Sequence, residues 1–171
     1  VRRSGGSVAF DSTAPVATVY LPDRSYVVSL STIAGTVSDT APGTVQSGYF
    51  RVKRGVSDYW NWKLSTFTAI SGSDNDLTAT IGTGLAEYST DYFKSGAAWE
   101  TNQTYGVQLF LTDKAGNSGS SVEKTFTVDR SSPSAGFVLP LDANKSGISY
   151  IPSISGTALD NWGDSNAEVY L

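Results

Sequence analysis

The sequence contains no cysteine, no histidine and no methionine among its 171 residues. Without cysteine, the chain can form neither a disulfide nor a cysteine–zinc site. Without histidine, it lacks the usual general base, the usual transition-metal ligand and any serine–histidine triad. Methionine is missing even at position 1, so we expect the chain to be an excerpt from a longer protein.

Charge is also scarce, since only 16% of the residues are charged and the net charge is −4. Such a chain repels a phosphate backbone, and it has no basic stripe interleaved with aromatic residues, so we expect no nucleic-acid partner. It contains neither a signal peptide nor an apolar run long enough to span a bilayer. We therefore expect no membrane insertion in this segment.

Aromatic and small residues are plentiful instead. Four Trp, nine Tyr and seven Phe, with 39% hydrophobic residues overall, can build a packed core. Apolar and polar residues alternate in short runs separated by Gly, Asn and Ser, and no segment has the 3.6-residue period of a core helix. The runs predict strands over residues 16–22, 31–39, 47–55, 59–64, 77–82, 105–112 and 121–128. This pattern predicts an all-β protein with a β-sandwich fold.

An internal repeat divides the chain. FDSTAPVATVYLP (10–22) matches VDRSSPSAGFVLP (128–140), and IAGTVSD (33–39) matches ISGTALD (154–160). The two matches are offset by 118 and 121 residues, so a three-residue insertion separates the copies. Two successive copies of one module are therefore expected, opening at Asp11 and at Asp129.

The repeat predicts three parts. Residues 1–10 would be the last strand of a preceding module, residues 11–128 one complete module, and residues 129–171 the first strands of a following module. This second module would be incomplete within the chain. Three strands alone leave an apolar face uncovered, which either the rest of the same protein or another chain would cover.

The order of the motifs DSTAP, AGTVSD, YWNW, TYGVQLFLTDKAGN and FTVDRSSP resembles the bacterial immunoglobulin-like (Big-type) repeats of large surface proteins and adhesins. The resemblance covers nearly the whole chain. It implies an immunoglobulin-like β-sandwich module in a tandem array, without fixing a ligand. The module departs from the pattern in length, because its 118 residues exceed the roughly 100 of a typical immunoglobulin domain. The excess falls within residues 65–100.

The acidic loops suggest a metal site. In an immunoglobulin-type sandwich, the start of the chain and two of the loops meet at one pole, and here those places hold Asp11, Asp39 and the TDKAGN loop with Asp113 and Asn117. Calcium takes six to eight oxygen ligands, which such a pole can offer. We therefore expect Ca²⁺ there, although Asp and Asn are also ordinary turn residues. Residues equivalent to the first two, namely Asp129 and Asp160, would begin a second such site.

Aromatic residues between positions 56 and 100 suggest a second kind of site. Trp60, Trp62 and Trp99 could stack on sugar rings. The alternative is that they belong to the core, and the period-two spacing of the first two predicts that both face the interior together. Tyr105 has the position of a corner tyrosine, whose hydroxyl bonds to nearby backbone.

These observations favour a structural role over catalysis. We expect an extracellular or cell-surface segment that serves as a stalk or spacer, with adjacent modules of the same protein as its main partners and calcium at the junctions. The alternative is a module that binds a host or surface glycan, or another ligand, through the aromatic-rich region. We expect no enzyme activity, because no pair of carboxylates is placed face to face by the sequence.

Overall fold

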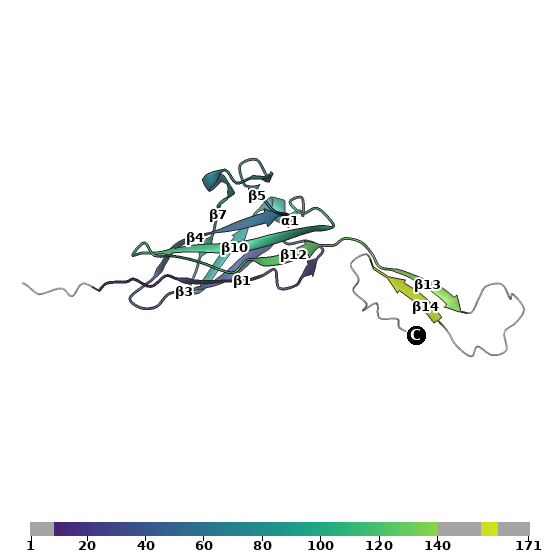
Figure 1. The fold of residues 1–171 in the computed structure, drawn as a ribbon, viewed down its shortest axis with the longest axis horizontal. Helices are drawn as coiled ribbons and strands as arrows, with labels where there is room; N and C mark the ends of the chain where they lie inside the picture. The colour runs from purple at the N-terminus through teal and green to yellow at the C-terminus, as the bar shows by residue number, and fades with distance from the viewer. Residues whose placement is uncertain (1–8, 140–154, 161–171) are drawn as a thin grey trace, which may run out of the picture. The chain divides into compact units, whose positions relative to one another are not determined.

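The computed structural model describes residues 9–139 and 155–160. The chain divides into two units, one ending at Asp129 and one beginning at Arg130, and Figure 1 labels the main strands of each. The division falls next to the boundary that the repeat predicts after residue 128. The strand expected over residues 1–10 lies largely outside the described residues.

The first unit is an all-β sandwich of two mainly antiparallel sheets. One sheet has the order β1 (Val16–Leu21), β3 (Thr32–Ser38), β9 (Leu85–Ser89) and β8 (Thr80–Ile81). The other has the order β2 (Tyr26–Val27), β12 (Lys124–Val128), β10 (Gln103–Asp113), β4 (Val45–Arg54), β5 (Asp58–Asn61) and β6 (Thr66–Ala69). Two short strands pair beside this path, namely β11 (Ser118–Ser120) with β10 and β7 (Leu77–Thr78) with β4. This is the strand order of an immunoglobulin-type sandwich with extra strands at one edge.

Alternate side chains of the long central strands form the core. In β10 the residues that alternation placed on one face are all buried: Tyr105, Val107, Leu109 and Leu111. The facing sheet comes so close that a Cβ on Gly35 would lie 2.7 Å from the Leu109 side chain. The Tyr105 hydroxyl accepts a hydrogen bond from the backbone N–H of Glu100 at 2.7 Å. The predicted corner tyrosine is therefore confirmed.

Three of the predicted strands differ from the structure. The run 59–64 ends early, because β5 stops at Asn61 and a turn follows. The run 77–82 splits into β7 and β8, which belong to different sheets. The run 121–128 begins late, since β12 starts at Lys124, and Val122 therefore lies exposed rather than on the core face.

The region 65–100 holds several of the elements that the sequence pattern missed. Besides β6 and β9 it contains a 3₁₀ turn, η1 (Gly72–Asn75), and a single helical turn, α1 (Asp91–Lys94). The fully buried residue of β9 is Ala86, which is small, and Tyr88 on the same face is only partly buried where it packs against the core. No helix in the described part of the chain is long and apolar enough to cross a bilayer.

The first and last parts of the sandwich are joined by a parallel pair. β2 runs parallel to β12, with Tyr26 opposite Thr127 and Val27 opposite Val128. Two backbone hydrogen bonds flank this register, from the Thr127 N–H to the Ser25 carbonyl at 2.7 Å and from the Asp129 N–H to the Val27 carbonyl at 3.0 Å. The end of the unit is thus fastened to a segment near its beginning.

The described part of the second unit is an antiparallel strand pair, β13 (Ser134–Leu139) with β14 (Ser155–Leu159). Its register repeats that of β1 with β3, pair for pair. Val16 opposite Ser38 corresponds to Ser134 opposite Leu159, and the three following pairs correspond in the same way. Both registers then slip by one residue before the fifth and last pair. The two strand pairs therefore share their pairing and their irregularity at the offsets found in the sequence.

Candidate functional site

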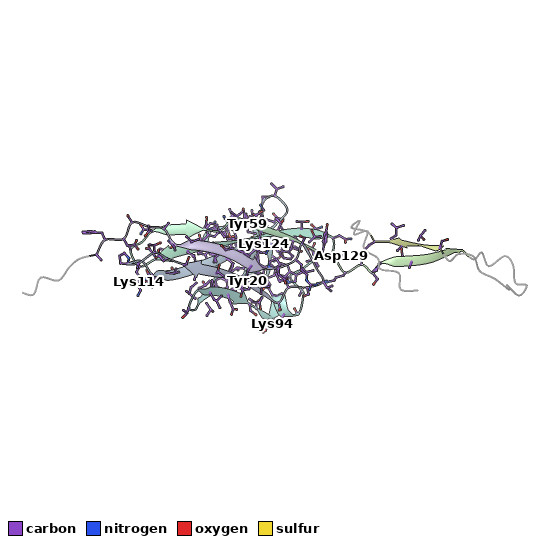
Figure 2. The ribbon with its side chains drawn as sticks, turned by 90° about the horizontal axis from the view of Figure 1, so that it is seen from below. Tyr20, Tyr59, Lys94, Lys114, Lys124 and Asp129 are labelled. Atoms are coloured by element: carbon purple, nitrogen blue, oxygen red, sulfur yellow. The ribbon has the colours of Figure 1, made fainter. Side chains whose placement is uncertain are left out.

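Three carboxylates meet at one pole of the first unit. One oxygen of each of Asp11, Asp39 and Asp113 lies within 4.8 Å of the others. Asp11 precedes β1, Asp39 follows β3 directly, and Asp113 is the last residue of β10. Figure 2 labels Lys114 at this pole and Asp129 toward the opposite end of the unit. The structure thus brings together the three acids that an immunoglobulin-type topology predicts at this pole. We call them the aspartate cluster.

The TDKAGN loop positions Asp113. The Asp113 carboxylate accepts the Asn117 backbone N–H on Oδ1 and the Asn117 side-chain amide on Oδ2, both at 2.8 Å. The backbone closes the loop from the Asp113 N–H to the Asn117 carbonyl at 3.0 Å. Gly116 adopts a φ of +94°, which an L side chain rarely tolerates. Asp113, Gly116 and Asn117 therefore each stabilise the turn.

The electrostatics of the loop keep Asp113 ionised. The side chain is fully buried, and this burial alone would raise its pKa. Hydrogen bonds from the Asn117 side chain and from the backbone N–H groups of Asn117, Gly116 and Ala115 outweigh it and hold the pKa below the ordinary value.

The other two carboxylates are only half satisfied. Oδ1 of Asp11 accepts the Thr13 N–H at 3.0 Å and its hydroxyl at 2.6 Å, and Oδ1 of Asp39 accepts the Thr40 N–H at 2.9 Å. The Oδ2 atoms of both are buried and have no hydrogen-bond partner. Buried polar atoms nearly always have a partner, so two such oxygens beside a third carboxylate make the cluster a candidate site for a cation.

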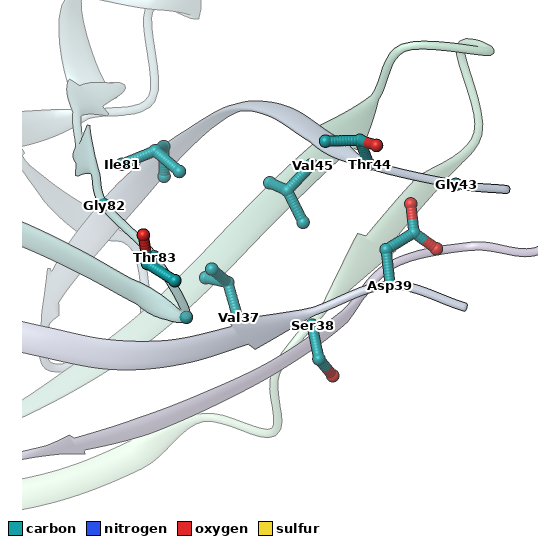
Figure 3. Close-up of a pocket in the computed structure, with 10 residues that line it drawn as sticks. Val37, Ser38, Asp39, Gly43, Thr44, Val45, Ile81, Gly82 and Thr83 are labelled. Atoms are coloured by element: carbon teal, nitrogen blue, oxygen red, sulfur yellow. The ribbon is translucent and has the colours of Figure 1, made fainter. Parts of the chain in front are cut away.

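Gly43 leaves the space in which these oxygens sit. A Cβ on this residue would lie 2.5 Å from Oδ2 of Asp39 and 2.6 Å from Oδ2 of Asp11. Figure 3 shows the Asp39 carboxylate beside Gly43 at the rim of a hollow of about 560 Å³. Val37, Val45 and Ile81 form apolar parts of its lining. The role of Gly43 is not visible in the sequence, because its Pro-Gly context marks a turn but not what packs against it.

The donor set suits a hard cation. All of the candidate ligand atoms are carboxylate oxygens, and carboxylates, carbonyls and water favour Ca²⁺ or Mg²⁺ over softer metals. Within the described residues, none of the ion pairs includes a member of the aspartate cluster. No lysine or arginine of that part of the chain therefore neutralises the three charges.

Asn117 lies against two members of the aspartate cluster, as the sequence predicts. The Asn117 side-chain amide donates to Oδ2 of Asp113 and, at 3.3 Å, to the backbone carbonyl of Asp11. The Asn117 backbone carbonyl accepts the Asp113 N–H. Asn117 therefore holds the aspartates in place, and its expected contribution of an oxygen ligand stays a prediction. The second predicted site also stays a prediction, because Asp129 belongs to the first unit and Asp160 to the second.

The predicted aromatic site is divided by the fold. Trp60 and Trp99 are buried, with 3% and 2% of their surface exposed, whereas Trp62 is 49% exposed. The prediction that Trp60 and Trp62 share a buried face is wrong, because β5 ends at Asn61 and the alternation stops there. Two of the three rings are thus unavailable for a ligand.

By its strand order, the first unit is an immunoglobulin-type β-sandwich. No family model matches the chain, and no curated protein matches it either. The resemblance to bacterial immunoglobulin-like repeats therefore stays a prediction that no relative supports.

Proposed function

We propose that this chain is a segment of an extracellular or cell-surface protein in which immunoglobulin-like modules follow one another as a stalk or spacer, as in an adhesin. The partners would be the adjacent modules of the same protein, with a host or surface molecule bound elsewhere along it. In such an array each module contacts only its neighbours, so the number of modules sets the reach.

The common register of the two strand pairs carries this proposal. A matching sequence could arise from shared turn chemistry, but five matching pairs with the same slip require the same strand geometry. The residues before each copy add support. Val128 is a core residue at the end of β12, whereas its counterpart Phe10 is 89% exposed. An exposed phenylalanine at this place is what the last strand of a preceding module would leave.

We further propose that the aspartate cluster binds Ca²⁺. The support comes from the two unpartnered oxygens of Asp11 and Asp39, the third carboxylate beside them and the space at Gly43. Bound calcium would supply the positive charge that these acids lack and would fix the segment before β1 against two loops. Because Asp11 and Asp129 stand at the starts of the two copies, the ion would stiffen the link between modules.

Replacing Gly43 by alanine is expected to weaken calcium binding about tenfold or more, the usual effect of disturbing groups around a metal. The added methyl would displace two of the three carboxylates. The measurement is isothermal titration of the whole chain with CaCl₂. The matched control is Gly82→Ala, because Gly82 lines the same hollow and a Cβ there meets nothing within 4 Å. Equal affinities for the two variants would contradict the proposed site.

Residues 129–171 expressed alone are expected to show no cooperative unfolding. An isolated two-stranded hairpin is at best marginally stable in water, because it cannot bury an apolar face. In β14 the described side chains are all exposed, including Leu159. Circular dichroism during a thermal scan is the measurement, with the whole chain as the control. A sigmoidal transition from the monomeric fragment would mean that these residues are a complete domain rather than the first strands of a module.

The proposed tandem array can be tested on the sequence of the full-length protein. We expect further copies of the pattern that opens at Asp11 and closes with TDKAGN, spaced by about one module. A natural protein with three or more copies should show a longer end-to-end distance with calcium than with chelator in electron micrographs, because stiffer links straighten the array. If the frame contains a single sandwich beside a catalytic domain, the spacer function is ruled out.

A further inference from the structure

A second hollow lies apart from the aspartate cluster. It has a volume of about 230 Å³ and is lined by Trp62, Asp76, Leu77, Thr78 and Tyr88. These residues come from the turn after β5, from the segment of β7 and from β9. We call it the Trp62 hollow. Its walls belong to one unit, so its geometry does not depend on neighbouring modules.

The indole of Trp62 is held in place. Its Nε1–H donates to the Ser73 carbonyl of η1 at 3.4 Å. The Lys63 ammonium lies 5.5 Å from the ring centroid and pairs with Asp74 at 2.6 Å. Because Lys63 does not line the Trp62 hollow, the ammonium leaves the hollow side of the indole open. A half-exposed ring that is already oriented loses little freedom when a ligand stacks on it.

Two hydroxyl groups in the hollow are available to a ligand. In the part of the chain that the structure describes, neither Thr78 nor Tyr88 uses its hydroxyl in a hydrogen bond to another residue. Burial raises the pKa of the Tyr88 hydroxyl, so this group stays protonated and can donate at neutral pH. Thr78 is exposed at the rim. The hollow therefore offers donors and acceptors beside an aromatic surface.

The hollow carries little net charge. Its one acidic residue, Asp76, accepts a hydrogen bond from Nε of Arg51 at 2.6 Å, and the two form an ion pair. The carboxylate keeps lone pairs for a further donor, while its charge is already balanced. A cationic ligand would therefore gain little electrostatic energy in this hollow. An uncharged ligand with hydroxyl groups would not need that charge, because it can donate to the carboxylate lone pairs.

We propose that the Trp62 hollow binds a single uncharged pyranose ring. One C–H face of the sugar stacks on the indole, and its hydroxyls bond to Asp76, Thr78 and Tyr88. The volume is below the roughly 300–1,000 Å³ of pockets for drug-sized ligands, which limits the site to about one ring. This site is independent of the spacer function, and it accounts for the one exposed tryptophan among the three predicted to bind glycans.

The test follows the Trp62 indole N–H in ¹H–¹⁵N spectra of the whole chain. Glucose, galactose, mannose and N-acetylglucosamine are each added to tens of millimolar, with a chelator present so that the aspartate cluster plays no part. At least one sugar should shift this signal and the amide of Thr78 in a saturable way. Tyr88→Phe removes one hydroxyl and should weaken binding about two- to tenfold.

Two variants separate the hollow from general surface effects. Trp62→Ala should abolish the Thr78 shift, while Leu64→Ala, an exposed residue of the same turn outside the hollow, should leave it unchanged. The proposal is overturned if none of the four sugars shifts the wild-type signals, or if Trp62→Ala, with its other amide signals unchanged, still binds. A shift caused by lysine amide but by no sugar would also overturn it and would identify a cation site.

Discussion

Replacing Trp99 by alanine is expected to lower the free energy of unfolding by about 3–5 kcal/mol, the usual cost of truncating a buried aromatic side chain. The ring is 2% exposed, and its centroid lies 4.6 Å from that of Phe93, 5.1 Å from Tyr105 and 5.4 Å from Phe126. Its Nε1–H also donates to the buried Leu30 carbonyl at 2.7 Å, which alanine would leave without this donor. Domains of this size have about 5–15 kcal/mol in total, so the loss is a large share.

Urea denaturation followed by circular dichroism measures this change, and Trp62→Ala is its matched control. Trp62 is half exposed, so its truncation should cost less than about 1 kcal/mol. A similar cost for both variants would show that the Trp99 ring is not part of the core. The pair also distinguishes core packing from any effect of simply losing a tryptophan.

Calcium is expected to stabilise the chain by about 2.7 kcal/mol at a hundredfold excess over its dissociation constant, provided that it binds only the folded state. The Asp113→Ala variant should lose this increment, because the loop then presents no carboxylate to complete the aspartate cluster. The variant should also unfold more easily in chelator, since both Asn117 donors lose their acceptor. Thermal unfolding of the whole chain in millimolar CaCl₂ and in chelator measures both effects.

The quantity that decides the calcium proposal is the difference between the two buffers, not the stability in either one. Asp23→Ala serves as the control, because it removes an exposed acid that follows β1, whereas Asp11 precedes this strand, so the two lie at opposite ends of β1. This variant should keep the full calcium increment. If the wild-type midpoint is the same with calcium and with chelator, the three aspartates serve only as turn residues.

The site was more predictable from the sequence than several of the strands. Asp11, Asp39 and Asp113 are far apart in the chain, but an immunoglobulin-type topology returns their segments to one pole. That inference needs the immunoglobulin-type topology, which the resemblance implies, together with the positions of the strands along the chain. Strand order alone does not show that Oδ2 of Asp11 and Oδ2 of Asp39 lack a hydrogen-bond partner, because hydrogen bonding depends on local geometry.

Where alternation is weak or broken, the sequence was less informative. β9 escaped detection because its buried residue is Ala86, and Trp62 was placed inside because nothing in the run 59–64 marks the end of β5 at Asn61. The importance of Gly43 depends on atoms from two distant segments. Such features arise from packing between elements, which a pattern along the chain does not record.

The parallel pairing of β2 with β12 has a consequence for a protein under tension. If the chain is pulled at its two ends, these strands are drawn in opposite directions along their common axis. The hydrogen bonds around Val27 and Val128 are then loaded together in shear, rather than opened one after another as in a hairpin pulled apart at one end. The first unit would therefore resist being pulled apart between its two ends.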